Sequence, residues 1–161
     1  MATANKNLSD YSKEHLPDAH NMRFGLVVSE WNEHITENLF EGAKICLVEN
    51  GVLPENITRI NVPGTFELPY GAKKLANTNA YDAIIVIGCV IQGETRHFDF
   101  VCQGVTQGVA HLNAIQDTPI IFCVLTDNHV QQSIDRSGGK HGNKGTEAAV
   151  AAIKMGAIKR S

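Results

Sequence analysis

Residues 81–112 read YDAIIVIGCV IQGETRHFDF VCQGVTQGVA HL, and this stretch decides the fold. Ala83–Cys89 is a short apolar run rich in Ile and Val, which is typical of a strand buried on both faces of a parallel sheet. From Phe98 onward the apolar residues fall three or four apart, as they do on one face of a helix. The stretch therefore predicts a strand, a loop over Val90–His97 and a helix.

The loop after this strand is the first candidate for a ligand site. Open α/β sheets bind ligands at the carboxyl ends of their strands. The loop contains Gly93 and leads into a helix N-terminus, where free backbone N–H groups attract anions. Histidine ordinarily titrates near neutral pH, so His97 at the end of the loop suits general acid–base catalysis. A purely structural role for His97 is the alternative.

The rest of the chain repeats the alternation of strand and helix. The predicted strands are Arg23–Ser29, Ile57–Val62 at an edge, and Ile120–Leu125. Two long helices are predicted over Glu33–Asn50 and Thr146–Lys159. Two further helices are predicted, one capped by Thr65 that runs to Ala76 and a short one capped within Thr126–Asn128 that runs to Arg136. Ser137–Asn143 is expected to be a flexible loop. This order predicts a three-layer α/β/α sandwich with a four-stranded parallel sheet, similar to flavodoxin.

Composition narrows the function classes. The 161 residues suffice for one domain, expected over residues 23–161 after an N-terminal arm over 1–22. A net charge of −3 argues against a nucleic-acid partner, and no apolar run is long enough to imply a membrane span. The N-terminus lacks the apolar core of a secretory signal, so a cytoplasmic protein is expected. The four cysteines form no CxxC pair and fit reduced core residues.

Several familiar cofactor and catalytic motifs do not occur in the sequence. No GxGxxG follows the first strand, and neither HExxH nor GxSxG is present. The seven histidines show no metal-ligand spacing. Gly139–Gly145 resembles a P-loop only superficially, because it follows a helix and its glycine–lysine spacing differs. We therefore expect no metal and no organic cofactor.

Polar and aromatic residues near the strand ends are further candidates. Trp31, on the turn after the first strand, is either a core anchor or a stacking surface for a flat ligand. Glu67, beside a helix N-terminus, either stabilises the helix dipole or accepts ligand hydroxyl groups. Arg136 and Lys144 are placed to reach a phosphate.

Three separated motifs resemble those of lumazine synthases, the penultimate enzymes of riboflavin biosynthesis. They are Gly88–Asp99 (GCVIQGETRHFD), Val62–Pro69 (VPGTFELP) and Leu125–Gly145, which ends in GNKG. They occur in the family's order, and the likeness runs from about Arg23 to Ala157. The resemblance implies condensation of 5-amino-6-(D-ribitylamino)uracil with 3,4-dihydroxy-2-butanone 4-phosphate, which yields 6,7-dimethyl-8-ribityllumazine, phosphate and water.

The resemblance also implies roles for individual residues. The pyrimidine stacks on the ring that matches Trp31, and His97 transfers protons. The ring and ribityl chain are held by two segments, Thr65, Phe66, Glu67 and Cys89, Val90, Ile91; the phosphate is held by Glu94, Thr95 and Arg136. The positions of Phe122, Arg136 and Lys144 come from the neighbouring subunit, so the site would exist only in a homo-oligomer.

The assembly implied by the resemblance is a pentamer or a sixty-subunit shell of twelve pentamers. Ser137–Asn143 is short, as in shell-forming members, and favours the shell. Riboflavin synthase is a candidate partner, and the arm before Arg23 is long enough to pair with the sheet edge of an adjacent subunit. Two departures touch the edge of the ring pocket, namely Cys123 in place of the common glycine and Asp127-Asn128-His129 in place of a threonine-rich run.

Two other classes of function stay open on the sequence alone. One is a shell or binding protein with little catalysis, which the intact His97, Arg136 and Lys144 disfavour. The other is a flavodoxin-like signalling or flavin-binding module, which the missing phosphate-loop signature disfavours. A turnover assay with both substrates separates the first from an enzyme, and bound flavin in the purified protein would indicate the second.

Overall fold

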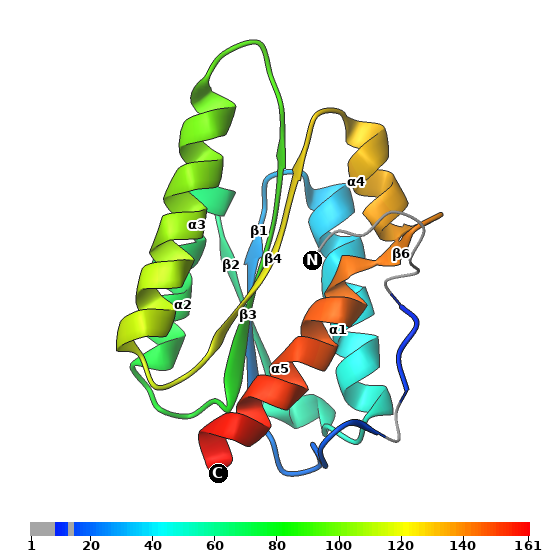
Figure 1. The fold of residues 1–161 in the computed structure, drawn as a ribbon, viewed down its shortest axis with the longest axis vertical. Helices are drawn as coiled ribbons and strands as arrows, with labels where there is room; N and C mark the ends of the chain where they lie inside the picture. The colour runs from blue at the N-terminus through cyan, green and yellow to red at the C-terminus, as the bar shows by residue number, and fades with distance from the viewer. Residues whose placement is uncertain (1–8, 13–14) are drawn as a thin grey trace.

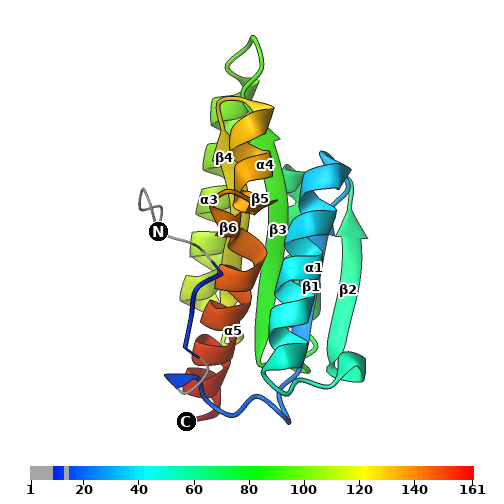
Figure 2. The same cartoon turned by 90° about the vertical axis from the view of Figure 1, so that its right-hand side faces the viewer.

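A computed structural model describes residues 9–12 and 15–161 of the chain (Figure 1). One sheet contains four parallel strands in the order β2-β1-β3-β4. The strands are β1 (Phe24–Ser29), β2 (Ile57–Val62), β3 (Ala83–Ile91) and β4 (Ile120–Asp127). Helices α2 (Leu68–Ala76) and α3 (His97–Ile115) cover one face, and α1 (Glu33–Glu49) and α5 (Lys144–Arg160) cover the other (Figures 1 and 2). The predicted three-layer sandwich with a four-stranded parallel sheet is confirmed.

The central position of β3 explains its apolar sequence. Every side chain over Ala83–Cys89 is buried, because helices lie on both faces of this strand. Successive residues of the neighbouring β1 alternate between the two cores: Leu26 packs with α1 and α5, and Val27 packs with α2 and α3. Strand β2 is only half-buried and lies at the edge, as its alternating sequence predicted.

The close approach of α1 and α5 fixes where α5 begins. A methyl group on Gly145 would lie 1.8 Å from the carbonyl oxygen of Leu39, so only glycine fits there. The Asn143 side chain accepts a hydrogen bond from the Gly145 N–H at 2.7 Å and donates to the Asn38 carbonyl at 2.9 Å. These contacts hold Lys144 at the first turn of α5.

The segment Ser137–Asn143 corrects one prediction, because it is not a structureless loop. It forms an antiparallel hairpin of β5 (Ser137–Gly139) and β6 (Gly142–Asn143), which follows α4 (Val130–Arg136). Gly138 and Gly142 supply the positive φ angles of 116° and 82° that the hairpin needs. Asp135 anchors it, since its carboxylate lies 3.0 Å from Lys140 Nζ and its carbonyl accepts the His141 N–H at 2.9 Å.

Two predicted helix caps are also corrected. Thr65 begins a 3-10 turn, η3 (Thr65–Glu67), ahead of α2, and its hydroxyl caps neither helix. Asp127 is the last residue of β4, and His129 stands at the start of α4 without a side-chain cap. In both places an extra turn or strand residue separates the polar side chain from the helix that the sequence pattern assigned to it.

Part of the predicted N-terminal arm contacts the chain's own core. Ala19 and Met22 are buried, and Asn50 Nδ2 donates to the Tyr11 hydroxyl at 3.0 Å. The hydroxyl of Ser9 accepts the Asn143 N–H at 3.0 Å. A second 3-10 turn, η2 (Pro54–Asn56), precedes β2. Across residues 9–12 and 15–161, no helix combines the length and apolar character needed to cross a bilayer.

Candidate active site

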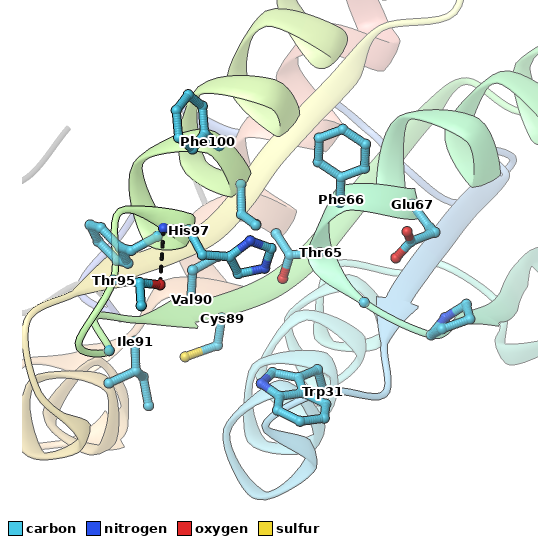
Figure 3. Close-up of a pocket in the computed structure, with 15 residues that line it drawn as sticks. Trp31, Thr65, Phe66, Glu67, Cys89, Val90, Ile91, Thr95, His97 and Phe100 are labelled. Carbon is cyan, nitrogen blue, oxygen red and sulfur yellow. Dashed lines mark hydrogen bonds between the residues drawn. The ribbon is translucent and has the colours of Figure 1, made fainter.

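A cavity of about 650 Å³ opens at the carboxyl edge of the sheet (Figure 3). Its walls come from the β1–α1 turn, the η3 segment, the end of β3 and the first turns of α3. Nine predicted site residues line it: Trp31, Thr65, Phe66, Glu67, Cys89, Val90, Ile91, Thr95 and His97. Because the strands are parallel, the turn at Trp31 and the motifs Val62–Pro69 and Gly88–Asp99 meet at one edge of the sheet.

Trp31 is a wall of this cavity and not a core anchor. Its side chain is 71% exposed and stands on the turn between β1 and α1. The next residue, Asn32, adopts a left-handed backbone with φ 60°, which asparagine tolerates better than most residues. Asn32 Nδ2 donates to the Cys89 carbonyl at 3.0 Å, which ties this turn to the end of β3. The exposed indole face is available for stacking against a flat ligand.

The η3 segment packs closely against α3 at Gly104. A methyl group on Gly104 would lie 2.4 Å from a ring carbon of Phe66, so the ring needs this glycine beneath it. Glu67 is exposed at the cavity. Thr65 is 5% exposed, and its Oγ1 is buried without a hydrogen-bond partner. The segment therefore offers the cavity an aromatic ring, a carboxylate and an unsatisfied hydroxyl.

Cys89 contributes a protonated thiol to the wall of the cavity. Burial raises the pKa of this thiol to about 11, although the nearby Ser133 hydroxyl acts in the opposite direction. Since the thiolate is the nucleophilic form of cysteine, this side chain is not suited to covalent catalysis at neutral pH. Its Sγ instead lies 3.4 Å from Ser133 Oγ as a hydrogen-bond donor.

His97 is the first residue of α3, and its imidazole is exposed at the cavity. Its backbone N–H lies 3.4 Å from the Thr95 hydroxyl (Figure 3). The N-terminus of α3 gives this corner a partial positive charge. An exposed imidazole beside an anion-attracting helix end can exchange protons with a bound molecule. Glu94 is exposed on the same loop but does not line the cavity.

Three predicted site residues lie elsewhere on the chain. Phe122 and Lys144 line a second cavity of about 320 Å³ between β4 and α5, and Lys144 Nζ lies 2.6 Å from a Glu147 carboxylate oxygen. Arg136 ends α4, where its guanidinium donates to the Gln132 carbonyl at 2.9 Å. None of these three lines the first cavity.

Three further residues at the first cavity were not predicted as site residues from the sequence. Phe98, Phe100 and Val101 line the cavity, and Phe100 is 62% exposed. The helical spacing of Phe98 and Val101 suggested the buried face of α3, but that face begins only at Val105. At this end α3 begins beyond the ends of β1 and β2 (Figures 1 and 2), and its first apolar residues line the cavity.

The sequence model of the 6,7-dimethyl-8-ribityllumazine synthase family matches residues 21–160. Curated relatives with that name include one from Flavobacterium johnsoniae, 65% identical over 160 residues that make up 99% of this chain and 84% of the relative. Another, from Christiangramia forsetii, is 62% identical over 161 residues, with 99% and 96% covered. The chain belongs to the 6,7-dimethyl-8-ribityllumazine synthase family.

Membership of the 6,7-dimethyl-8-ribityllumazine synthase family makes the chain a transferase of the penultimate step of riboflavin biosynthesis. The enzyme interpretation of the three motifs is thereby confirmed, and the signalling-module alternative is set aside. A third relative, from Parabacteroides distasonis, is 58% identical over 155 residues, 96% of this chain and 97% of its own length. The likeness to lumazine synthases therefore covers both the residues that line the first cavity and Phe122, Arg136 and Lys144.

Proposed function

We propose that the cavity at the carboxyl edge of the sheet binds 5-amino-6-(D-ribitylamino)uracil. The exposed indole of Trp31 supports this, because a pyrimidine ring can stack on it. The segments Thr65–Glu67 and Cys89–Ile91 both line the cavity and hold the ring and the ribityl chain. The exposed Glu67 carboxylate accepts hydrogen bonds from ribityl hydroxyl groups.

The second substrate, 3,4-dihydroxy-2-butanone 4-phosphate, binds with its phosphate near the N-terminus of α3. Free backbone N–H groups there favour an anion, and Glu94 and Thr95 belong to the loop that leads into this helix. Arg136 of the neighbouring subunit completes the phosphate site, since a guanidinium can donate two parallel hydrogen bonds to phosphate oxygens. Lys144 and Phe122 of that subunit close the site.

The chemistry needs positioned reactants and a group that moves protons. The aryl amine attacks the ketone carbonyl, and loss of water gives an imine. The phosphate then leaves as a second product, and ring closure with loss of another water yields 6,7-dimethyl-8-ribityllumazine. His97 accepts and returns protons during these steps. The reaction requires no metal and no organic cofactor.

The observation that carries this proposal is that one chain does not bring all the predicted site residues to the first cavity. Nine line it, Glu94 lies on the loop beside it, and Phe122, Arg136 and Lys144 lie elsewhere. A neighbouring copy can bring these three residues to the cavity within a ring of subunits. We propose a pentameric ring, twelve of which form a sixty-subunit shell in the cytoplasm, with residues 23–161 as the domain, residues 1–22 as an arm and riboflavin synthase as a partner.

Subunit mixing tests the shared site. His97→Ala and Arg136→Ala are each expected to turn over slowly, since each damages one half of every site. When the two variants are dissociated, mixed in equal amounts and reassembled, about one site in four receives both wild-type halves, so about a quarter of the wild-type activity should return.

A matched control uses His97→Ala with Trp31→Ala. Both residues line the same cavity of one chain, so mixing these variants cannot restore a complete site. Recovery in the first pair and none in the control supports the shared site. No recovery from a reassembled first pair, or equal recovery in both pairs, contradicts it.

A further inference from the structure

A buried hydrogen-bond network connects the first cavity to helix α4. The Cys89 thiol lies 3.4 Å from the Ser133 hydroxyl, which donates to the Asp127 carboxylate at 2.8 Å. Ser133 is fully buried, and Cys89 and Asp127 are 1% and 8% exposed. We call these three residues the α4 network. Because these buried polar groups cannot form hydrogen bonds with water, each one depends on its neighbour in the network for a hydrogen-bond partner.

The α4 network joins segments that carry the proposed substrate contacts. The Cys89 carbonyl accepts the hydrogen bond from Asn32, next to Trp31. The Asp127 carbonyl accepts the Gln92 N–H at 2.9 Å, which holds the loop after β3. One end of the network is therefore fixed to a wall of the cavity and the other to the loop that leads to His97, and its middle member belongs to α4.

Helix α4 depends on this anchor for its position. Its seven residues are too few for a helix that is stable by itself, and no side chain caps its start. Ser133 lies at the middle of α4, on the side that faces the sheet, and Arg136 follows almost one turn later. The Arg136 guanidinium also bonds to the Gln132 carbonyl of the same helix. Where Ser133 is held therefore determines where the guanidinium lies.

We propose that the α4 network is a positioning device that links the first cavity of one subunit to Arg136, and thereby to phosphate binding in the adjacent site. This inference rests on the proposed function, which assigns Arg136 to the phosphate. Ser133 and Asp127 touch no substrate; they act through Cys89 and Arg136.

A double-mutant cycle tests the proposal on the assembled enzyme, with each substrate varied in turn. Ser133→Ala is expected to raise the KM for the phosphate-bearing substrate roughly threefold to tenfold. In an Arg136→Lys background the same change should add less than about twofold, because the arginine that it positions is already lost. A serine that only stabilises the fold would give effects that multiply.

The outcomes separate this inference from the proposed function. If Arg136→Lys raises the phosphate KM but Ser133→Ala does not, or if the two effects multiply, the positioning role is overturned and the phosphate role of Arg136 stands. If Arg136→Lys leaves that KM unchanged, the phosphate role fails and the inference fails with it.

A control variant outside the network isolates its hydrogen bonds. Ser137→Ala removes a buried hydroxyl 3.5 Å from the Ile134 carbonyl, just beyond α4, and should leave both KM values unchanged. A defect in Ser137→Ala as large as that of Ser133→Ala overturns the proposal. If Ser133→Ala does not assemble, Cys89→Ala replaces it, because it interrupts the network from the cavity side. If the effects of Cys89→Ala and Arg136→Lys on the KM for the phosphate-bearing substrate multiply, the proposal is overturned.

Discussion

Thr65 shows how a single side chain can be poised for a ligand. Within the described residues, its Oγ1 is the buried side-chain oxygen that has no hydrogen-bond partner. A buried hydroxyl without a partner costs about 1–3 kcal/mol. Thr65 also lines the first cavity, and its Oγ1 lies beside Gly88 of β3. We infer that a bound substrate supplies the missing partner.

Thr65→Val tests this inference because valine keeps the shape and removes the hydroxyl. The free enzyme should gain up to about 1 kcal/mol in its free energy of unfolding, while the KM for the pyrimidine substrate should rise roughly threefold to tenfold. Thr65→Ser should keep a KM near that of wild type. Denaturant unfolding and steady-state kinetics measure both effects, and a variant that is less stable yet binds normally would show that the hydroxyl serves the fold.

The contacts of individual side chains were the hardest feature to predict from the sequence. The motif around Thr65 matched a helix cap, since threonine is common at that position, but the intervening 3-10 turn moved it into the cavity wall. Cys89 and Ser133 are 44 positions apart. No local pattern links two such residues, because their contact arises only when β3 and α4 meet in the fold.

At the scale of elements, an ion pair fixes the far end of α5 to the sheet. Arg160 Nε lies 2.6 Å from one Asp82 carboxylate oxygen, and the Arg23 N–H donates to the other at 2.6 Å. Burial acts to raise the pKa of Asp82, but the hydrogen bonds from Arg160 and Arg23 outweigh it and lower this pKa below its ordinary value. The pair therefore ties the end of α5 to the starts of β1 and β3.

The lowered pKa of Asp82 makes a pH-dependent contribution to stability. A carboxyl group whose pKa is lower in the folded state stabilises the fold above its unfolded pKa, near 4, and loses this effect as pH falls through the folded value. Asp82→Asn should therefore lower the free energy of unfolding by about 1–2 kcal/mol at pH 7, and by less below about pH 4. Urea unfolding at several pH values measures this difference.

Asp99→Asn is the matched control for Asp82→Asn. Asp99 pairs with Arg96 at 3.4 Å, but both side chains are largely exposed, so solvent screens the pair and its loss should change stability little. An equal loss of unfolding free energy in both variants would contradict the stabilising role of the Asp82–Arg160 pair. An Asp82→Asn effect that stays the same below pH 4 would contradict it as well.

Most elements were predictable, and the exceptions have local causes. The buried run of β3 and the alternation of β2 follow from burial on both faces or on one. The β5–β6 hairpin was predicted to be a loop, because a glycine-rich segment has no apolar period. Its order comes from the bonds of Asp135 to Lys140 and His141, which a hydrophobic pattern cannot reveal.

At the scale of the whole molecule, the chain by itself leaves the proposed site divided. Phe122 is 41% exposed on β4, the last strand of the sheet order, and Lys144 lies beside it in the second cavity. Trp31 and Phe100 are exposed at the first cavity. Large exposed aromatic groups at two places are typical of surfaces that meet another molecule. The proposed ring brings the two places together.

The mass of the active particle tests the central proposal, that the site forms between subunits. Sixty copies of the 17.5 kDa chain give a shell of about 1,050 kDa. Gel filtration with light scattering, and a turnover assay on each fraction, should find the activity in a particle of that mass. A pentamer that carries the activity would contradict the shell and leave the shared site standing. A 17.5 kDa monomer that turns over both substrates would contradict the shared site itself.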